Sequence, residues 1–495
     1  MNTQADPGLR RLRERTADAL FAVLPQDELA AAERCAARLR AELPDQEDLR
    51  RNVVLVAYGG GKDSSYTIAF VRAVQLILFR QRGTTFRIRV ATNRHSGMPQ
   101  AVMENIDRTY RALGLFDDAD CQMLTVDGAG ISDFRVDAPQ PRHLMERDRA
   151  DILMTGHRTF AEARPTFCNS CNVRMVDSFA LAASHGEVVD LIVTGDSREE
   201  QRAYAFWVHR LSHRFGRPAA RSRGFGGFVR AMTDLSDIYY RDIHGSVSPD
   251  RAIDADALGR LSFFSIYDET EYSAGNHWEL LTDFLHFSFD DLAFSFTESD
   301  CGNPLLMAHI RGLKCERLYG RDYAEGIREY VDFAVELMRR KEFPPVLIDA
   351  MIDRYSGQAA ICQQRARANR FAWDAYRITQ QHLVCMAYSP FADGMAGLDT
   401  FLLREHSFLW KRRADIRAMV ADHSACDPDL ARELLRISGL TVPQIRILQE
   451  RPLMKRADDT SQLLGAVLDG DPHKAVIKTR HSPGGPLVAE LISGR

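Results

Sequence analysis

The sequence predicts an α/β fold, in which a doubly wound parallel sheet follows N-terminal helices and precedes an α-helical C-terminal domain. Short continuous apolar runs alternate with stretches of helical periodicity, and after Asp322 only helical patterns occur. Continuous apolar runs are typical of central parallel strands, because helices cover both faces of such a sheet. We therefore expect ligands to bind beyond the carboxyl ends of the strands.

The first segment, residues 1–50, has apolar positions at helical spacing over residues 8–42, which predicts one or two amphipathic helices that end near Pro44. Five strand–helix alternations follow it. The expected strands are Val53–Tyr58, Phe86–Ala91, Gln122–Val126, Ile152–Thr155 and Val188–Thr194. The expected helices are Ser64–Phe79, Gln100–Leu113, Leu144–Ala150, Val173–Ala183 and Glu199–Leu211.

Two larger domains are expected after the N-terminal segment. The sheet domain spans residues 51–320 and contains an inserted basic loop at 209–230, and an α-helical domain spans residues 321–495. A Pro/Gly-rich surface loop is expected near the C-terminus at His481–Gly485. The helices expected in the C-terminal domain are Ala324–Arg340, Val346–Tyr355, Ala368–Val384, Phe401–Ala421, Pro428–Ile437 and Val442–Gln449.

The composition is that of an ordinary globular protein. The 495 residues include 45% apolar and 27% charged residues, and 64 basic against 68 acidic side chains give a net charge of −4. This balance argues against a chain built mainly to coat nucleic acid, although a local basic patch is compatible with it. No apolar run approaches the roughly 20 residues that span a bilayer. Nine widely spaced cysteines are typical of reduced thiols, so we expect a cytoplasmic protein.

A glycine-rich loop follows the first expected strand and opens a helix. Glycines let the backbone curl around phosphate oxygens, and the helix N-terminus attracts anions. A Walker loop is excluded because Asp63 follows the lysine, and a dinucleotide fingerprint is excluded because the glycines stop at Gly61. A metal ion could be held by Asp63, and the lysine adds a mobile positive charge. The residues of this string are Tyr58, Gly59, Gly60, Gly61, Lys62, Asp63, Ser64 and Ser65.

The string resembles the PP-loop of the ATP pyrophosphatase superfamily, whose folds are HUP-like and whose pattern is S-G-G-x-D-S. The residues Gly60–Ser64 match G-G-x-D-S, and Gly59 replaces the leading serine. The resemblance implies that ATP, with Mg²⁺, is cleaved between its α and β phosphates to adenylate a substrate oxygen. It also implies a nucleotide site that includes Thr92, near the end of the second strand. A later T-G-D stretch takes the place of the family's G-H/D motif, and its residues are Thr194, Gly195 and Asp196.

A single C-x-x-C pair, Cys168 and Cys171, lies just before the expected helix Val173–Ala183. Such a pair is compatible with a zinc half-site, a redox pair or part of an iron–sulfur site. The order of PP-loop, C-x-x-C and G-D stretch resembles the tRNA thiolases of the two-thiocytidine and two-thiouridine type. That resemblance implies a [4Fe–4S] cluster with a third ligand, for which we prefer Cys301 over Cys315. Zinc and unliganded thiols remain open alternatives.

The segment His209–Arg230 contains six arginines, two histidines and three phenylalanines. Basic residues interleaved with aromatic ones suit single-stranded nucleic acid, and the thiolases have a basic loop at this place. A lid that clamps the phosphates of ATP is the alternative. The substrate therefore remains open between tRNA and a small molecule or peptide.

Three functions follow from these patterns. The leading one is an ATP-dependent, AMP-forming enzyme that adenylates a substrate oxygen and then substitutes sulfur from a sulfur donor, using a three-cysteine iron–sulfur site. The second is an ATP-dependent ligase or amidotransferase that forms an amide or amidine on a small molecule, with structural cysteines. The third is a non-enzymatic nucleotide-binding module. A homodimer is compatible with each of them.

Overall fold

The computed structural model describes residues 6–128, 130–196, 198–216, 224–247, 253, 255, 258–270, 277–288, 303–340, 342–422, 427–454, 463–469 and 474–493. These residues form a mixed α/β structure with a six-stranded, mostly parallel sheet and many helices, which confirms the α/β expectation at this level.

The chain divides into two compact units that alternate along the sequence. The first consists of Met1–Pro139, Arg174–Asp234 and Arg251–Phe294, and the second of Gln140–Val173, Leu235–Asp250 and Ser295–Arg495. The boundary expected at residue 320 therefore falls inside the second unit. Two helices run from one unit into the other, α6 (Ala163–Ser184) and α8 (Phe225–His244).

The first unit holds the sheet. Its strands are β1 (Val53–Ala57), β2 (Arg87–Asn93), β3 (Cys121–Asp127), β4 (Gly130–Asp133), β5 (Leu191–Val193) and β6 (Ser262–Phe264). Its α-helices are α1 (Pro7–Val23), α2 (Gln26–Glu42), α3 (Lys62–Arg82), α4 (Gln100–Ala112) and α7 (Arg198–Arg214). Shorter turns are the 3₁₀ helices η1 (Leu49–Arg51) and η2 (Ile266–Asp268) and the π-helical turn η3 (Leu280–Phe284).

The strand order is β4-β3-β2-β1-β5-β6. Every neighbouring pair is parallel except β3 and β4, which are antiparallel. The chain starts in the middle of the sheet, adds β2 and β3 on one side of β1, and later adds β5 and β6 on the other. The loops that follow β1 and β5 are consequently neighbours at the carboxyl edge of the sheet.

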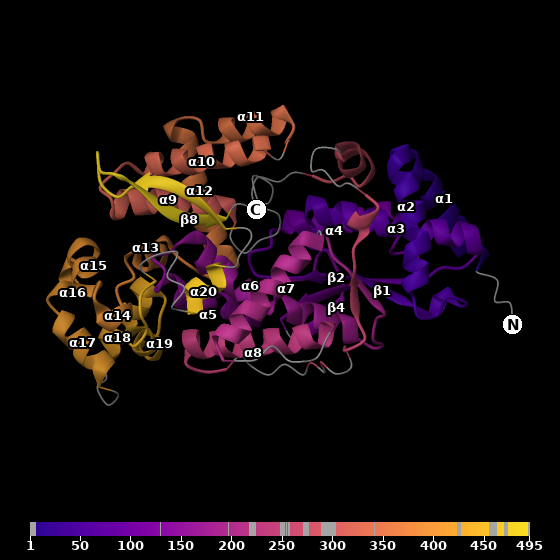
Figure 1. Cartoon of the computed structure of the whole chain (residues 1–495). Coiled ribbons are helices and arrows are strands. Elements are labelled where there is room, and N and C mark those ends of the chain that lie inside the picture. The colour runs from indigo at the N-terminus through magenta and orange to yellow at the C-terminus, as the bar shows by residue number, and fades with distance from the viewer. Residues whose placement is uncertain are drawn as a thin grey trace. The chain divides into compact units, whose positions relative to one another are not determined.

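The centre of the first unit is apolar because β1 and α3 are buried along most of their length. Both N-terminal helices pack on α3, as Figure 1 shows, and they confirm the helices expected over residues 8–42. The charges that α3 buries are paired. The guanidinium of Arg72 lies 2.9 Å from the carboxylate of Asp118, which also accepts from Arg13 at 2.7 Å. Paired burial avoids the free-energy cost of an isolated buried charge.

One expected strand is wrong. The residues Ile152–Thr155 belong to helix α5 (Arg142–Gly156), which continues without a break from the helix expected at Leu144–Ala150. A run of three apolar residues and a threonine cannot distinguish a buried strand from a buried helical turn, and no glycine or proline separates the two segments. Two strands of this sheet were not expected from the sequence, the antiparallel edge strand β4 and the three-residue β6.

The second unit is mainly helical. Besides α5 it contains α9 (Pro304–Arg317), α10 (Tyr323–Arg340), α11 (Pro345–Arg354), α12 (Gly357–Tyr376), α13 (Gln380–Tyr388), α14 (Ala392–Met395), α15 (Leu398–Glu405), α16 (Ser407–Trp410), α17 (Arg413–Ala421), α18 (Pro428–Ser438), α19 (Val442–Gln449) and α20 (Leu463–Asp469). The long helix expected at Ala368–Val384 is interrupted, because Arg377 adopts a left-handed conformation with φ 53° and ends α12. The helix expected at Phe401–Ala421 is divided among α15, α16 and α17.

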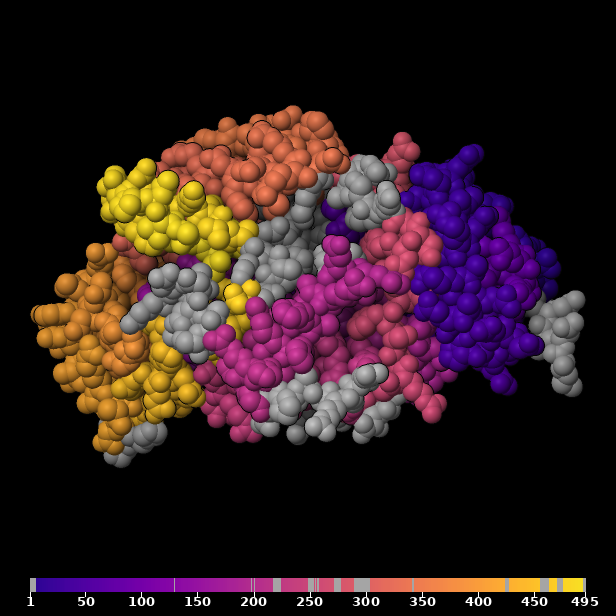
Figure 2. All heavy atoms as spheres, viewed as in Figure 1, coloured from indigo at the N-terminus to yellow at the C-terminus, as the bar shows by residue number. Residues whose placement is uncertain are grey.

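The expectation of an entirely α-helical C-terminal domain is wrong at its end. Strands β7 (Lys474–Arg480) and β8 (Leu487–Ser493) form an antiparallel hairpin, and the segment expected as a surface loop, His481–Gly485, connects them. The hairpin packs on α10, and Figure 2 shows it at the surface in yellow. Exposed and buried side chains alternate over Val476–Arg480 of β7, but the buried positions include a threonine, so the apolar residues themselves show no strand period.

Among the described residues, none of the helices combines the length and the apolar character that crossing a membrane requires.

Candidate functional site

The loop between β1 and α3 requires glycine at its centre. The φ of Gly60 is +77°, a conformation that L-residues with a side chain rarely adopt. A Cβ at this position would lie 2.7 Å from Val102 Cγ1 and 2.8 Å from Ile106 Cγ1, both on α4. The loop therefore makes a tight turn against α4, and its backbone leads directly into the start of α3.

The start of α3 has no side-chain cap. The N-cap residue is Gly61, which has no side chain to accept from the N–H groups of the first turn. The hydroxyls of Ser64 and Ser65 instead donate back to the carbonyl oxygen of Gly61, at 3.0 and 2.8 Å. The N–H groups at a helix start carry partial positive charge, so this end of α3 favours a phosphate or carboxylate.

Beside these N–H groups, Lys62 is buried, with its side chain only 5% exposed. Its ammonium forms an ion pair with the carboxylate of Asp63, whose side chain is 34% exposed. Burying an ammonium is unfavourable unless a negative group accompanies it. The loop thus holds a positive charge at the sheet edge, with a partly exposed carboxylate oxygen that a divalent cation could use.

Two of the residues expected to contact nucleotide are part of the supporting structure. The hydroxyl of Tyr58 lies 2.9 Å from Ser65 Oγ and donates to Thr109 Oγ1 at 3.0 Å. Burial raises the pKa of Tyr58 to about 12, so its hydroxyl stays neutral. The Ser65 hydroxyl is engaged by Tyr58 and by the Gly61 carbonyl, and the structure therefore places it beneath the loop.

The T-G-D stretch lies against the same turn of α3. It follows β5, which pairs with β1 so that Val193 is opposite Val56. A Cβ added to Gly195 would lie 3.8 Å from the Cα of Ser64 and 3.4 Å from Thr67 Oγ1. The structure therefore brings together two segments that the sequence analysis singled out and that lie more than a hundred residues apart.

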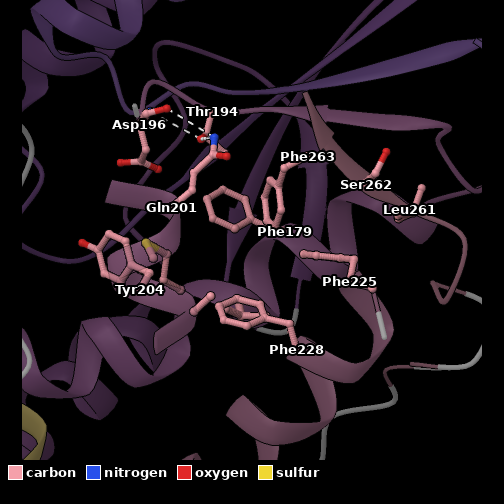
Figure 3. Close-up of a pocket in the computed structure, with 14 residues that line it drawn as sticks. Phe179, Thr194, Asp196, Gln201, Tyr204, Phe225, Phe228, Leu261, Ser262 and Phe263 are labelled. Atoms are coloured by element: carbon pink, nitrogen blue, oxygen red, sulfur yellow. Dashed lines mark hydrogen bonds between the residues drawn. The ribbon is translucent and has the colours of Figure 1, made fainter. Parts of the chain in front are cut away.

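Two residues that hold this stretch were missed in the sequence analysis. The hydroxyl of Tyr267 donates to the carbonyl oxygen of Gly195 at 3.1 Å. The amide of Gln201 donates to Thr194 Oγ1 at 3.3 Å and to the carbonyl oxygen of Asp196 at 3.2 Å, as the dashed lines in Figure 3 mark. Neither residue belongs to a motif, and only the fold brings them to the site.

The end of β2 is the third part of this edge. Ala57, the last residue of β1, is opposite Ala91, so Thr92, near the end of β2, lies at the level where the glycine loop begins. Thr92 is fully buried, and the next residue, Asn93, accepts a hydrogen bond from Ser178 at 2.9 Å. Thr92 therefore lies in the wall beside the loop.

The cysteine pair belongs to the second unit, and its expected position just before a helix is wrong. Helix α6 already begins at Ala163, so Cys168 and Cys171 lie within it, one turn apart on the same face. The side chain of Cys168 is buried and that of Cys171 is partly buried. The helix is longer than expected because Pro165 lies in its first turn, a position that tolerates proline.

The described residues do not complete a three-cysteine site. The preferred third ligand, Cys301, lies outside the described residues. The alternative, Cys315, is buried on α9 and packs against Gly326, and burial raises the pKa of its thiol to about 11. Within the part of the chain that the structure describes, no group of three His, Cys, Asp or Glu side chains could hold a metal ion. The described cysteines therefore supply two ligands for a [4Fe–4S] cluster, Cys168 and Cys171, but not the third.

The expected basic loop at 209–230 is helical at both ends where it is described. Residues 209–214 complete α7, and residues 225–230 begin α8. Residues 217–223, which carry three of its six arginines, lie outside the described residues.

In comparisons with known proteins, no family model, curated protein or solved structure matched the chain.

Proposed function

We propose that the first unit binds ATP at the loop after β1 and transfers AMP to an oxygen of the substrate. The observation that carries this proposal is the buried Lys62 at the uncapped start of α3, beside a loop in which the backbone of Gly60 and its contacts with α4 favour glycine. Backbone N–H groups, a helix dipole and an ammonium converge there, and these are the groups that bind a leaving pyrophosphate.

The sheet topology supports the same proposal. Strand order reverses at β1, and in doubly wound sheets a nucleotide binds in the crevice at such a point. The G-G-x-D-S string lies at this reversal, as it does in the PP-loop enzymes that the sequence resembles. We therefore propose that the unit is a doubly wound, PP-loop-like domain.

In the proposed reaction, a substrate oxygen attacks the α-phosphorus of ATP. The bond from that phosphorus to the oxygen bridging to the β-phosphorus breaks, and pyrophosphate leaves with the electron pair. Lys62 and the α3 N-terminus neutralise the charge that develops on pyrophosphate. Asp63 would supply an oxygen ligand to Mg²⁺, and the bound ion would further offset the charge of the phosphates. Asp196, next to the glycine that lies on α3, is the residue we assign to the acceptor side of the reaction.

The experiment is calorimetric titration with Mg²⁺ and the analogue α,β-methylene-ATP, which cannot be cleaved at the reacting bond. Lys62→Met removes a charge-assisted contact of about 1.5–3 kcal/mol, so affinity should fall at least about tenfold. Lys478→Met is the matched control, because Lys478 is exposed on β7 of the other unit. Equal affinity of the Lys62→Met variant and the wild type would refute the proposal.

A second candidate extends the reaction by a sulfur step, and the same-face pair Cys168 and Cys171 favours it. Sulfide from a donor would add to the carbon that bears the adenylated oxygen, and AMP would leave with the carbon–oxygen electron pair. Anaerobic purification with iron and sulfide assays tests this candidate. Cys168→Ser or Cys171→Ser should remove most of the bound iron, whereas Cys35→Ser should not. If the wild-type protein contains no iron, an amine and not sulfur would be the nucleophile that displaces AMP.

A further inference from the structure

An aromatic cavity adjoins the T-G-D stretch within the first unit. It has a volume of about 330 Å³, which is the size of small-molecule sites, and its walls come from α6, α7, α8 and β6. Five aromatic side chains line it, and they are Phe179, Tyr204, Phe225, Phe228 and Phe263. Figure 3 shows these rings gathered around one space.

The cavity is accessible, and its rings are not ordinary core. Phe179, Phe228 and Phe263 are only partly buried, whereas the core phenylalanines Phe70 and Phe86 are fully buried. The ring of Phe225 packs edge-on against that of Phe263 at a centroid distance of 5.3 Å, which fixes one wall. Partly exposed rings that surround an open space favour occupation by another apolar group.

The polar groups of the lining are unevenly placed. Asp196 and Tyr204 lie at one end of the cavity, whereas Leu261 and Ser262 lie at the other, where the hydroxyl of Ser262 points away from the rings (Figure 3). At the first end, Gln201 holds Thr194 and the backbone of Asp196 in position. A ligand with an apolar body and one polar head therefore matches this distribution.

The polar end is continuous with the proposed ATP site. Thr194 and Asp196 line the cavity, and Gly195 between them lies against the first turn of α3. An acceptor whose head reaches Asp196 thus approaches the turn where we place the phosphates of ATP. A charged carboxylate head would be repelled by Asp196, whereas an uncharged carbonyl would not.

We propose that this cavity binds the aromatic ring of a small, uncharged carbonyl compound, and that its carbonyl oxygen is the atom that is adenylated. The adenylation step of this inference rests on the proposed function, whereas binding of the aromatic ring in the cavity does not depend on it. A nucleobase fits less well, because its polar edges would face the phenylalanine rings and lose their hydrogen bonds to water. The substrate class we infer is therefore an aromatic amide, not RNA.

The test is saturation-transfer NMR with three probes, phenylacetamide, 3-phenylpropanamide and indole-3-acetamide, and with cytidine and uridine for comparison. Ala205→Trp fills the cavity from α7, where Ala205 is exposed and a larger side chain is compatible with folding. The matched control is Ala203→Trp, an exposed position of the same helix that does not line the cavity. Thermal unfolding of both variants confirms that they fold.

At least one amide should bind to the wild type, and its affinity should fall tenfold or more in Ala205→Trp but stay within twofold in Ala203→Trp. No amide binding, or equal binding to both variants, overturns the inference. Binding of cytidine or uridine that only Ala205→Trp abolishes assigns the cavity to a base and also overturns it.

Lys62→Met separates this inference from the proposed function. Amide binding should persist in that variant, because Lys62 does not line the cavity. Amide binding without binding of α,β-methylene-ATP to the wild type would refute the ATP proposal alone. Binding of the analogue without amide binding would refute the cavity proposal alone.

Discussion

Each of the two units buries a lysine beside carboxylates, and the surroundings of these lysines differ. In the first unit, Lys62 stands at the start of a helix, at the carboxyl edge of the sheet, and pairs with the adjacent Asp63. In the second unit, Lys314 lies inside α9, with its ammonium 3.3 Å from both Glu162 and Glu490.

The surroundings of Lys314 form a closed network. Glu490 also accepts from Arg311 at 2.7 Å, and Arg311 pairs in turn with Glu329 at 2.8 Å. Burial lowers the pKa of Lys314, but the charges of Glu490 and Glu162 outweigh burial and hold it above its usual value. The carboxylates come from α5–α6, α10 and β8, so the network ties distant segments of the second unit together.

The comparison shows that burial of a charge does not by itself mark a functional site. A lysine enclosed by carboxylates from several segments is already neutralised and stabilises the fold. For a lysine that shares its position with an uncapped helix start and a glycine turn, we propose instead a role in binding an anion. The position of the charge relative to the sheet edge distinguishes the two, and the following predictions test this distinction.

The largest effect is expected at Lys314. Lys314→Met removes the cation between Glu162 and Glu490 and should lower the free energy of unfolding by about 3–5 kcal/mol, because a buried carboxylate is left uncompensated. Urea unfolding measures it, with the exposed Lys478→Met as control. By contrast, Lys62→Met should change the free energy of unfolding by less than about 1 kcal/mol. Equal destabilisation by the two buried-lysine variants would refute the distinction.

The glycine turn should show the next largest effect. Gly60→Ala places a Cβ within 3 Å of Val102 and Ile106 at a φ of +77°, so the first unit should lose about 1–3 kcal/mol. Gly83→Ala is the matched control, because Gly83 has a similar φ of +73° but nothing within 4 Å of the added Cβ. Chemical unfolding measures the loss of stability in both variants. The loss in Gly83→Ala reports the backbone strain alone, and the additional loss in Gly60→Ala reports the contact with α4. A Gly83→Ala variant that is destabilised as much would show that α4 does not restrict the loop.

Much of the surroundings of Lys62 could be expected from the sequence. The run Val53–Tyr58, the glycines and the helix expected from Ser64 predict the strand, the turn and α3 in the order that the structure has them, although α3 begins two residues earlier, at Lys62. The network around Lys314 could not be expected, because its members are separated by up to 328 positions, between Glu162 and Glu490, and carry no motif. Gln201 and the aromatic cavity escaped for the same reason, since only packing assembles them.

A pH effect of intermediate size is expected in the second unit. His309 is enclosed, with Nδ1 2.8 Å from the Tyr323 hydroxyl and Nε2 3.2 Å from Asn369 Oδ1. Burial lowers the pKa of His309 to about 3, below the usual 6.5. Between these values the unfolded chain binds more protons than the folded one, so stability should fall as the pH drops from 6.5 toward 3.

Hydrogen exchange at pH 7 and pH 5 measures this effect for α9 and α10. His309→Gln should flatten the pH dependence of exchange there, since glutamine has no proton to gain in this range. Unchanged dependence in that variant would assign the effect to other groups. Buried His157 is the first of these, because burial lowers its pKa to about 3 as well.

The smallest effect is expected from the basic end of α7. Arg210 and Arg214 belong to the stretch that suggested nucleic acid, yet the cavity next to this helix favours a small aromatic ligand. If RNA were the substrate, each lost phosphate contact would reduce the slope of log affinity against log salt by about 0.7 on single strands.

Under the small-molecule inference, bulk tRNA should not bind even at low salt. The double variant Arg210→Gln/Arg214→Gln should keep its affinity for α,β-methylene-ATP within twofold of the wild type. Filter binding of tRNA at two salt concentrations decides the matter. Salt-sensitive binding that these substitutions weaken would restore RNA as the substrate, and the basic stretch, not the aromatic cavity, would then define specificity.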